Sequence, residues 1–494
     1  MSSFQKRQQT ELEHYFETYR KKTIGINHQF ESVYGTQNLL YADWIASGRL
    51  YRPIEDIICN KIGPLMANTH SFSSESGKAA TYTYQEARRI IKNHVNANAN
   101  DVLVTTGSGM TGALAKLQRI MGLNRFGTIT DENDRPVIFI SHMEHHSNQV
   151  SWQTLKADVV LLQPDESLQI NPLELERQLL KYKDRKLKIG SFTACSNVTG
   201  TITDYYELAQ VMHSHNGFCF VDFAASAPYE AIDMHPENPK QKLDAIFFSP
   251  HKFLGGPGSS GVLVYDKKLH KNPHPDTPGG GNVKWTNPLG NFGYHQDLEI
   301  REDGGTPGIL QVIRTALCIR LKEQMNPILM KAREKELSQL FYNGIQNIPE
   351  VANLSNPNAD SIGCIAFNII GMHYNLVVRL LNDRFGIQTR GGWSCASSFA
   401  HYLMQIETEK STKLINEIEN HQLANKPGWV RLSLHPIMTD AEVLFIIKAI
   451  KEIIANNKEW EIAYNYNQST NEFDSIWQDD RELQKRMHSV FQEI

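Results

Sequence analysis

The sequence has few cysteines and no disulfide framework. Its 494 residues include only six cysteines, which are widely scattered and contain no Cys-x-x-Cys pair. They are Cys59, Cys195, Cys219, Cys318, Cys364 and Cys395. This distribution excludes a small disulfide-stapled scaffold and is typical of a protein in a reducing compartment. We therefore expect free thiols.

Long hydrophobic runs and a strong net charge are also missing. No stretch of about 18 apolar residues occurs, and the polar residues 1–24 lack the apolar core of a signal peptide. We expect a cytoplasmic protein with no membrane partner. The formal net charge of −4 provides no electrostatic basis for binding nucleic acid, which we exclude as a partner.

The composition that is present is that of a globular chain long enough for two or three domains. The N-terminal residues are polar and favour a helix, and we place a domain boundary near residue 326, within the helical patterns of residues 309–348. We predict an N-terminal helical arm, a large domain, a small C-terminal domain and a partly helical tail. Their expected bounds are residues 1–36, 37–325, 326–460 and 461–494.

Short apolar runs alternate with helical patterns between residues 102 and 265. This alternation predicts βαβ units and a mostly parallel sheet with helices on both faces. The expected strands are residues 102–106, 137–140, 159–162, 188–192, 218–221 and 245–248. The C-terminal part mixes strands and helices, and its last long helix is predicted to begin with a capping box at Thr439 and Glu442.

One lysine lies between the end of a predicted strand and a run of glycines. Lys252 follows the strand 245–248 after the strand-breaking pair Ser249-Pro250. Glycine costs backbone entropy and has no side chain to pack, so the run that follows indicates backbone lying close to a ligand. A surface lysine beside a flexible loop is the alternative interpretation. The glycines are Gly255, Gly256, Gly258 and Gly261.

Residues 107–112 read Gly-Ser-Gly-Met-Thr-Gly between a predicted strand and a helix. A dinucleotide fingerprint has this spacing, but it also needs an acidic residue at the end of the next strand. The strand 137–140 is followed by Ser141 and His142 instead. A helix N-terminus with exposed amides still binds a phosphate of any kind. We therefore predict a phosphate site at Ser108 and Gly109.

Asp222 follows the strand 218–221, at the carboxyl edge where parallel sheets bind ligands. A helix cap is its alternative role. Together with Lys252 and the phosphate turn, Asp222 fits one cofactor, pyridoxal 5′-phosphate. This cofactor needs a lysine for covalent attachment, a carboxylate beside its pyridine nitrogen and an anchor for its phosphate.

Three histidines lie close together in the sequence. His142, His145 and His146 do not have the spacing of a zinc motif, and no nearby carboxylate completes one. We predict no metal site, and expect instead that one ring stacks on the cofactor.

Cys395 follows Arg390 and the pair Gly391-Gly392. The glycines indicate a mobile segment, and the arginine would favour a thiolate. Since most cysteines are buried and inert, a structural role is the alternative interpretation.

Several motifs together resemble those of the class V branch of the fold-type I pyridoxal-phosphate enzymes, and within it the cysteine desulfurases and selenocysteine lyases. The resemblance extends from about Leu40 to Ile454. It implies a large domain with a mostly parallel seven-stranded sheet, a small C-terminal α/β domain, and a homodimeric enzyme that acts on an L-amino acid. The motifs are residues 143–148, 196–200, 221–222, 249–252, 304–307 and 390–395.

The resemblance also assigns roles around the cofactor ring. Lys252 would hold the cofactor covalently and move protons at the substrate carbon. Asp222 would pair with the pyridine nitrogen, and His145 would stack on the ring. Asn197 would approach the ring hydroxyl or the substrate carboxylate.

Further roles concern the phosphate and the substrate. The phosphate would be held by Ser108, Ser249 and His251. Thr306 would reach the phosphate of the neighbouring subunit, which implies the homodimer. Arg431 would grip the substrate carboxylate as a bidentate pair.

Cys395 falls where desulfurases keep the cysteine that attacks the substrate sulfur, which implies a persulfide on Cys395 and a sulfur-acceptor protein as a partner. Two departures from the family pattern concern this chemistry. Ala225 stands where the family has a residue that contacts the ring hydroxyl, and Trp393-Ser394 replace a histidine pair that can donate a proton. An aminotransferase, epimerase or lyase in which Cys395 is not catalytic, and a non-catalytic binding protein, remain alternatives.

Overall fold

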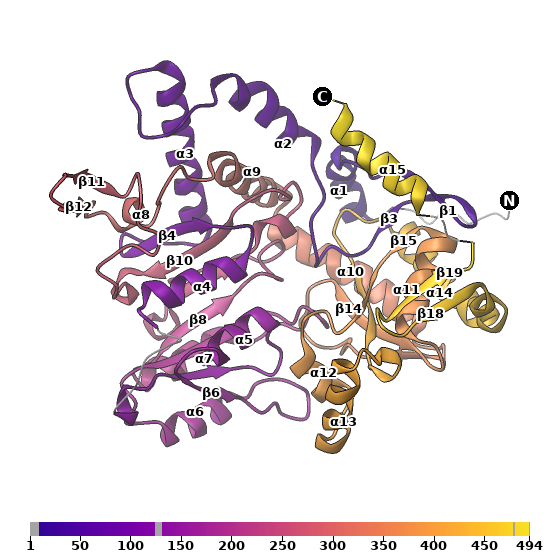
Figure 1. The fold of residues 1–494 in the computed structure, drawn as a ribbon. Helices are drawn as coiled ribbons and strands as arrows, with labels where there is room; N and C mark the ends of the chain where they lie inside the picture. The colour runs from indigo at the N-terminus through magenta and orange to yellow at the C-terminus, as the bar shows by residue number, and fades with distance from the viewer. Residues whose placement is uncertain (1–8, 124–130, 478–479, 494) are drawn as a thin grey trace.

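The computed structural model describes residues 9–123, 131–477 and 480–493 of the chain. Two α/β parts lie side by side, and the consecutive helices α9 (Ile309–Met325) and α10 (Pro327–Ile345) lead from one to the other (Figure 1). Helix α9 packs on α3 (Glu75–His94) in the larger part, and α10 packs on α14 (Asp440–Trp460) in the smaller part.

Within the described residues, the larger part is built on a seven-stranded sheet with the order β4-β10-β9-β8-β7-β5-β6. The strands from β9 to β6 are parallel, whereas β10 is antiparallel to both of its neighbours. The mostly parallel sheet predicted from the sequence is therefore confirmed, and β10 is the strand not named in advance. The strands are β4 (Asp101–Thr106), β5 (Val137–Ile140), β6 (Asp158–Leu161), β7 (Lys188–Thr193), β8 (Phe218–Asp222), β9 (Ala245–Phe248) and β10 (Gly261–Asp266).

Helices cover both faces of this sheet (Figure 1). Every residue of β5 is buried, as expected for a strand enclosed on both sides. Because side chains alternate along a strand, Val137 and Phe139 belong to one core, while Ile138 and Ile140 belong to the other. The helices that follow the strands are α4 (Met110–Ile120), α5 (His146–Gln153), α6 (Pro172–Lys181) and α7 (Tyr205–Ser214).

The smaller part contains an antiparallel sheet of four strands among the described residues, in the order β13-β14-β17-β16. Helix α14 begins with the predicted capping box, in which Thr439 and Glu442 bind each other's backbone N–H. The elements of this part are β13 (Val351–Asn353), β14 (Cys364–Ile369), α11 (Tyr374–Phe385), β15 (Ile387–Gln388), β16 (Arg390–Gly392), α12 (Ser397–Leu403), α13 (Thr408–Glu419) and β17 (Trp429–Ser433).

The two ends of the chain contribute further short elements. Residues 1–8 of the predicted arm lie outside the described residues, and the rest of it includes helix α1. In the described part of the chain, no helix combines the length and apolar character needed to cross a bilayer. The elements are α1 (Glu11–Lys22), β1 (Gln29–Ser32), β2 (Gly35–Asn38), β3 (Leu40–Tyr41), α2 (Arg52–Ile57), β11 (Val283–Thr286), β12 (Phe292–Tyr294), α8 (Leu298–Arg301), β18 (Tyr464–Asn467), β19 (Glu472–Ser475) and α15 (Arg481–Ser489).

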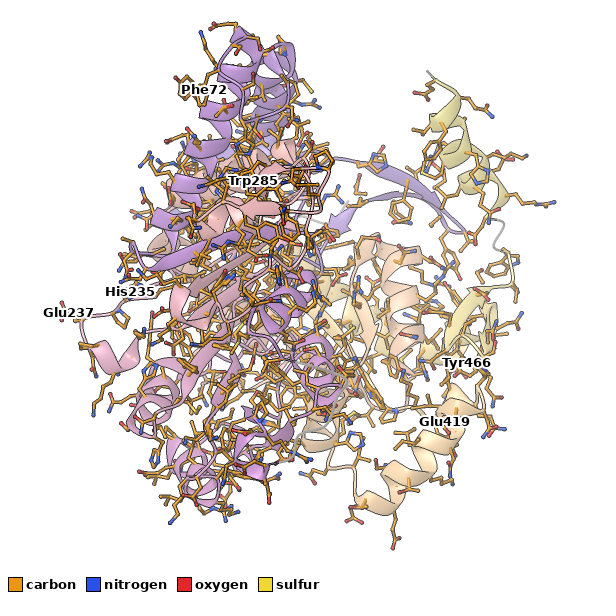
Figure 2. All side chains as sticks on the ribbon, turned by 60° about the vertical axis from the view of Figure 1, so that its left-hand side comes forward. Phe72, His235, Glu237, Trp285, Glu419 and Tyr466 are labelled. Atoms are coloured by element: carbon orange, nitrogen blue, oxygen red, sulfur yellow. The ribbon has the colours of Figure 1, made fainter. Side chains whose placement is uncertain are left out.

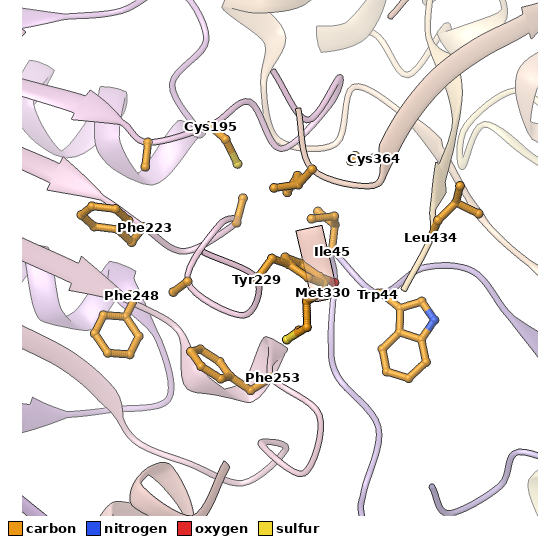
Figure 3. Close-up of a cluster of buried hydrophobic side chains, with 14 of the residues drawn as sticks. Trp44, Ile45, Cys195, Phe223, Tyr229, Phe248, Phe253, Met330, Cys364 and Leu434 are labelled. Atoms are coloured by element: carbon orange, nitrogen blue, oxygen red, sulfur yellow. The ribbon is translucent and has the colours of Figure 1, made fainter. Parts of the chain in front are cut away.

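A continuous buried cluster joins the two parts. Phe253 and Tyr229 come from the larger part, Met330 and Leu434 from the smaller part, and Trp44 from the N-terminal segment (Figure 3). The cluster includes Phe248 at the end of β9 and Leu434 directly after β17, so apolar packing sets where the ends of these strands lie relative to each other.

Candidate active site

A cavity of about 500 Å³ opens at the carboxyl edge of the large sheet, beside β16 and β17. In the parallel register Thr193 is opposite Asp222, and Asp222 is opposite Phe247. The carboxyl ends of β7, β8 and β9 therefore meet at this edge, the usual ligand crevice of such sheets. Its size suits a small molecule or a cofactor. The predicted site residues that line it are Ser108, Gly109, His145, Asn197, Asp222, Ser249, His251, Lys252, Cys395 and Arg431.

Lys252 and Asp222 form a pair of coupled ionisable groups. Lys252 ends the short helical turn 250–252 after β9, and Asp222 is the last residue of β8. Burial lowers the pKa of Lys252 below its ordinary value, an effect that Asp222 opposes. Burial likewise raises the pKa of Asp222 to about 6, although its Oδ1 accepts the Ala224 N–H at 2.8 Å. An amine and a carboxyl group perturbed in this way are typical of a functional site.

His145 is held by the start of helix α5. Its Nδ1 accepts the N–H of Ser147 at 3.1 Å, which caps the helix. Because Nδ1 is an acceptor, the neutral ring carries its proton on Nε2. Burial and the nearby charges of Lys252 and Arg431 lower the pKa of His145 to about 4. The ring is therefore uncharged at neutral pH and suited to stacking on a flat aromatic ligand.

The predicted phosphate turn leads from β4 into α4. Gly107 has the left-handed φ of 53° that favours glycine. Helix α4 begins without a side-chain cap among the described residues, and the Met110 N–H donates to Ser249 Oγ at 2.9 Å. A Cβ atom on Gly109 would lie 2.9 Å from the same oxygen. A side chain at position 109 would therefore displace Ser249 Oγ, and the helix N-terminus, which has no capping side chain at Gly109 itself, suits an anion.

Arg431 is oriented by two acceptors. Its Nη2 donates to Asp43 Oδ1 at 2.8 Å and its Nη1 donates to the carbonyl oxygen of Asn197 at 3.1 Å. Arg431 Nε and Asn197 Oδ1 are buried and have no hydrogen-bond partner in the described parts of the chain. Buried polar groups normally have partners, so this corner of the cavity is suited to a polar ligand.

Arg390 does not support the predicted effect on Cys395. Its Nε donates to Asp43 Oδ2 at 3.0 Å, so the guanidinium is paired with Asp43. Arg390 and Arg431 lie opposite each other on the paired strands β16 and β17. The two arginines therefore share one carboxylate because the strands bring them together.

Cys395 lies exposed on the wall of the cavity. Ser394 and Cys395 both have left-handed backbone conformations, with φ of 50° and 57°, and each costs on the order of 1 kcal/mol or more in a non-glycine residue. Two hydrogen bonds hold them there. Asn197 Nδ2 donates to the Ser394 carbonyl at 2.7 Å, and the His146 N–H donates to the Cys395 carbonyl at 2.8 Å.

The paired glycines before Cys395 allow close packing, whereas we predicted that they make the segment mobile. Gly391 and Gly392 lie in strand β16, paired with β17. A Cβ atom on Gly391 would lie 2.0 Å from Asn375 Oδ1. The absence of a side chain therefore allows close packing against α11, and the prediction of a mobile segment is not supported.

Trp393 and Ser394, which replace the family's histidine pair, both contact other side chains. The ring of Trp393 lies under the amine of Lys426, with Nζ 4.8 Å from the ring centroid. Ser394 Oγ accepts from Trp429 Nε1 at 3.3 Å. Burial lowers the pKa of Lys426, against the attraction of Cys395, so a cation stands close to the cysteine.

The three clustered histidines point to different surroundings. His142 is fully buried against Phe399 and Tyr402, and His146 Nε2 lies 2.7 Å from Ser397 Oγ. Across the described residues, no group of His, Cys, Asp and Glu side chains is arranged to hold a metal ion. Of the three, His145 lines the cavity.

Thr306 stands apart from the other predicted site residues. It is exposed and does not line the cavity of its own chain. Its Oγ1 accepts from Asn68 Nδ2 at 3.4 Å.

Sequence reasoning missed three residues near the site. Asp43, whose bridge to Ser433 places it beside β17, could have been noticed as an acid inside an apolar stretch, because a buried charge needs a partner. Thr193 lines the cavity at the carboxyl end of β7. Glu144, whose pKa burial raises to about 8, accepts from the Thr193 N–H at 2.9 Å and so links β7 to the loop that carries His145.

Comparisons with known proteins agree with this geometry. Residues 41–445 match the family model described as aminotransferase class-V. A "Probable cysteine desulfurase" of Halalkalibacterium halodurans is 28% identical over 384 residues, which are 76% of this chain and 88% of the relative. One of Halobacterium salinarum is 26% identical over 377 residues, 74% of this chain and 84% of the relative.

Solved structures show the same fold. The apo structure of a cysteine desulfurase from Thermococcus onnurineus NA1 superimposes with a TM-score of 0.72 at 22% identity, covering 92% of this chain and all of that one. The cysteine desulfurase CsdA (S-sulfonic acid) from Escherichia coli gives a TM-score of 0.69 at 20% identity, covering 89% of this chain and 98% of that one. The expected fold-type I architecture and the resemblance to desulfurases are confirmed.

Proposed function

Because the chain belongs to the aminotransferase class-V family, we propose that it is a pyridoxal-phosphate enzyme that removes the sulfur of L-cysteine, a cysteine desulfurase. One observation carries this proposal: the exposed thiol of Cys395 lines the same cavity as Lys252 and Asp222. The desulfurases among its relatives support it.

The residues of the cavity fit the cofactor. The uncapped start of α4, with Ser108, Ser249 and His251 around it, matches the phosphate. A positively charged pyridine nitrogen would stabilise the ionised form of Asp222, whose pKa burial raises to about 6. When bound through Lys252, pyridoxal phosphate withdraws electrons from the substrate carbon.

The residues of the cavity then have separate roles in the reaction. Arg431 binds the substrate carboxylate, and Asn197 helps to orient it. The amine of Lys252 takes the proton from the substrate α-carbon. The thiolate of Cys395 attacks the substrate sulfur, so an S–S bond forms and the C–S bond breaks. The electron pair of the broken bond remains with the β-carbon, which takes up a proton. The Lys252 amine then returns its proton to the α-carbon. The products are alanine and a persulfide on Cys395, which an acceptor protein discharges.

The partners and organisation follow from the same proposal. We propose a cytoplasmic homodimer in which Thr306 of each chain reaches the phosphate in the other chain's cavity. Residues 37–325 and 326–460 are the proposed large and small domains, between a 1–36 arm and a 461–494 tail.

A direct assay tests the proposal. Purified protein is supplied with pyridoxal phosphate, L-cysteine and dithiothreitol, and sulfide and alanine are measured. We expect equal amounts of both products. Cys395→Ser should release no sulfide while keeping the visible absorbance of the bound cofactor.

Cys59→Ser is the matched control, because Cys59 is the second exposed cysteine of the described chain and should leave the activity unchanged. Undiminished sulfide release by Cys395→Ser would instead favour an aminotransferase, epimerase or lyase that does not use Cys395. Absence of cofactor absorbance after addition of pyridoxal phosphate would favour a non-catalytic binding protein.

A further inference from the structure

The hairpin formed by β18 and β19 lies beyond the segment that the family model matches. That segment ends at residue 445, whereas the hairpin spans residues 464–475. Tyr466 lies on the outer side of the smaller part, near Glu419 at the end of α13 (Figure 2). The carbonyl of Gln468 in the turn accepts the Leu423 N–H at 3.2 Å. The hairpin therefore contacts the segment that leads into β17.

Asn471 is the residue that joins the hairpin to α11 of the smaller part through hydrogen bonds. It is buried, with 7% of its surface exposed, and has a left-handed φ of 63°. Its Nδ2 donates to the hydroxyl of Tyr374 at 2.6 Å, and its Oδ1 accepts from the hydroxyl of Tyr466 at 2.9 Å. Its carbonyl accepts from Asn375 Nδ2. The side chain thus joins the hairpin to the first turn of α11.

The residues that Asn471 binds pack directly on the glycines beside the cavity. A Cβ atom on Gly428 would lie 2.6 Å from the ring of Tyr374, and one on Gly391 would lie 2.0 Å from Asn375 Oδ1. These distances place the backbone of both glycines directly against side chains at the start of α11. Gly391 belongs to β16, and only Gly392 and Trp393 stand between it and the strained pair that ends in Cys395.

We propose that the C-terminal hairpin positions Cys395, and that Asn471 is the positioning residue. By holding Tyr374 and Asn375 against Gly391, the hairpin fixes the end of β16 from which the Cys395 segment departs. The inference rests on the proposed function for its kinetic consequence, but not for its effect on the thiol. The hairpin contacts the segments around β16 and β17, and it leaves Lys252 and Asp222 on the other wall untouched.

The test compares Asn471→Gly with the wild-type holoenzyme. Glycine accepts the left-handed backbone, so this variant removes the side-chain bonds without backbone strain. We expect kcat for sulfide release to fall roughly tenfold, because small displacements of reacting groups are costly. The visible absorbance of the bound cofactor should not change. Mass spectrometry should show iodoacetamide alkylating Cys395 severalfold faster, with Cys59 as the internal reference.

Thr470→Ala is the matched control, because Thr470 is exposed in the same turn, and it should behave like the wild type. If Asn471→Gly does not fold, Tyr374→Phe tests the proposal instead, since it removes only the hydroxyl that Asn471 binds. This variant should also lower kcat and speed the alkylation of Cys395. Unchanged alkylation of Cys395 and unchanged kcat would overturn the proposal. If the wild type releases no sulfide, the proposed function fails, and the alkylation ratio still decides whether the hairpin positions Cys395.

Discussion

Asp43 and Arg431 form an ion pair at the cavity, with Nη2 and Oδ1 2.8 Å apart, although 388 positions separate them in the sequence. The other carboxylate oxygen of Asp43 binds Arg390. One internal anion therefore balances one of two cations. Among these three groups one positive charge remains, which suits the carboxylate of the proposed amino acid substrate.

Replacing Asp43 tests this arrangement. In Asp43→Asn the buried guanidinium of Arg431 loses its charged partner and its orientation, and breaking such a pair is strongly destabilising. We expect KM for L-cysteine to rise roughly tenfold, equivalent to about 1.4 kcal/mol, with a smaller change in kcat. Steady-state kinetics measure this. Asp56→Asn, the same change at an exposed position of α2, is the control. A lower KM would show instead that Asp43 competes with the substrate.

The carboxylate of Asp222 should strengthen cofactor binding but lower the stability of the folded protein. In the folded protein without cofactor its pKa is about 6, whereas its ordinary value is 3.8. Between these pH values the folded state binds more protons than the unfolded state, so the free energy of unfolding falls as the pH rises. Above about pH 6 the loss of stability caused by the buried, ionised carboxylate reaches its full value.

Asp222→Asn removes this penalty. At pH 7.5 the cofactor-free variant should be more stable by on the order of 2 to 3 kcal/mol, with the difference vanishing near pH 4. Its affinity for pyridoxal phosphate should fall roughly hundredfold, because a charge-assisted hydrogen bond is lost. Urea denaturation across this pH range and cofactor titration measure the two effects. A variant less stable at every pH would contradict the burial argument.

His145 combines a structural role and a chemical one, and two substitutions separate them. Asparagine can still cap helix α5, whereas alanine cannot, so His145→Ala should be about 1 kcal/mol less stable than His145→Asn. Both should lose activity by about tenfold, because neither side chain can stack on the cofactor ring. Since the pKa of His145 is lowered to about 4, its protonation should not appear in the activity profile above pH 5. Equal stability of the two variants would argue against the capping bond.

Arg333 is the buried cation that ties the N-terminal helix to the smaller part. It is fully buried, lies 3.2 Å from Glu13 Oε2 and 2.9 Å from Asp440 Oδ1, and donates to the Met438 carbonyl at 3.0 Å. Arg333→Met should lower the free energy of unfolding by about 3 to 5 kcal/mol, because Glu13 loses its cation.

Chemical denaturation of the full chain checks this expectation. Arg320→Met is the control, because Arg320 is half exposed and pairs with Glu323 on the surface, so its loss should cost less than about 1 kcal/mol. Equal effects of the two substitutions would show that the Arg333 network does not stabilise the fold.

Several features of the site could be predicted because they depend on local sequence. Lys252, Asp222 and the turn at Ser108 each follow a short apolar run, and parallel strands place their carboxyl ends at one edge. That logic locates the residues that come from strand ends. It does not reach Asp43, whose partners lie on β16 and β17, nor Asn471, whose partners lie on α11.

Other features were misread because a pattern does not show what packs against it. Gly391 and Gly392 looked like a flexible hinge, whereas Gly391 makes room for Asn375 and Tyr374. Arg390 looked available to Cys395, but pairs with Asp43. In both cases the partner is remote in the sequence, and a residue's neighbours along the chain say nothing about it.

The sequence by itself determined the alternation of strands and helices, and with it the edge at which Lys252 and Asp222 meet, because periodicity and strand-breaking residues act over a few positions. Only the tertiary structure decided the backbone conformation that exposes Cys395 and the carboxylate that pairs with Arg431. Those properties depend on hydrogen bonds and ion pairs between residues that come together only when the large sheet, the small sheet and the C-terminal hairpin pack.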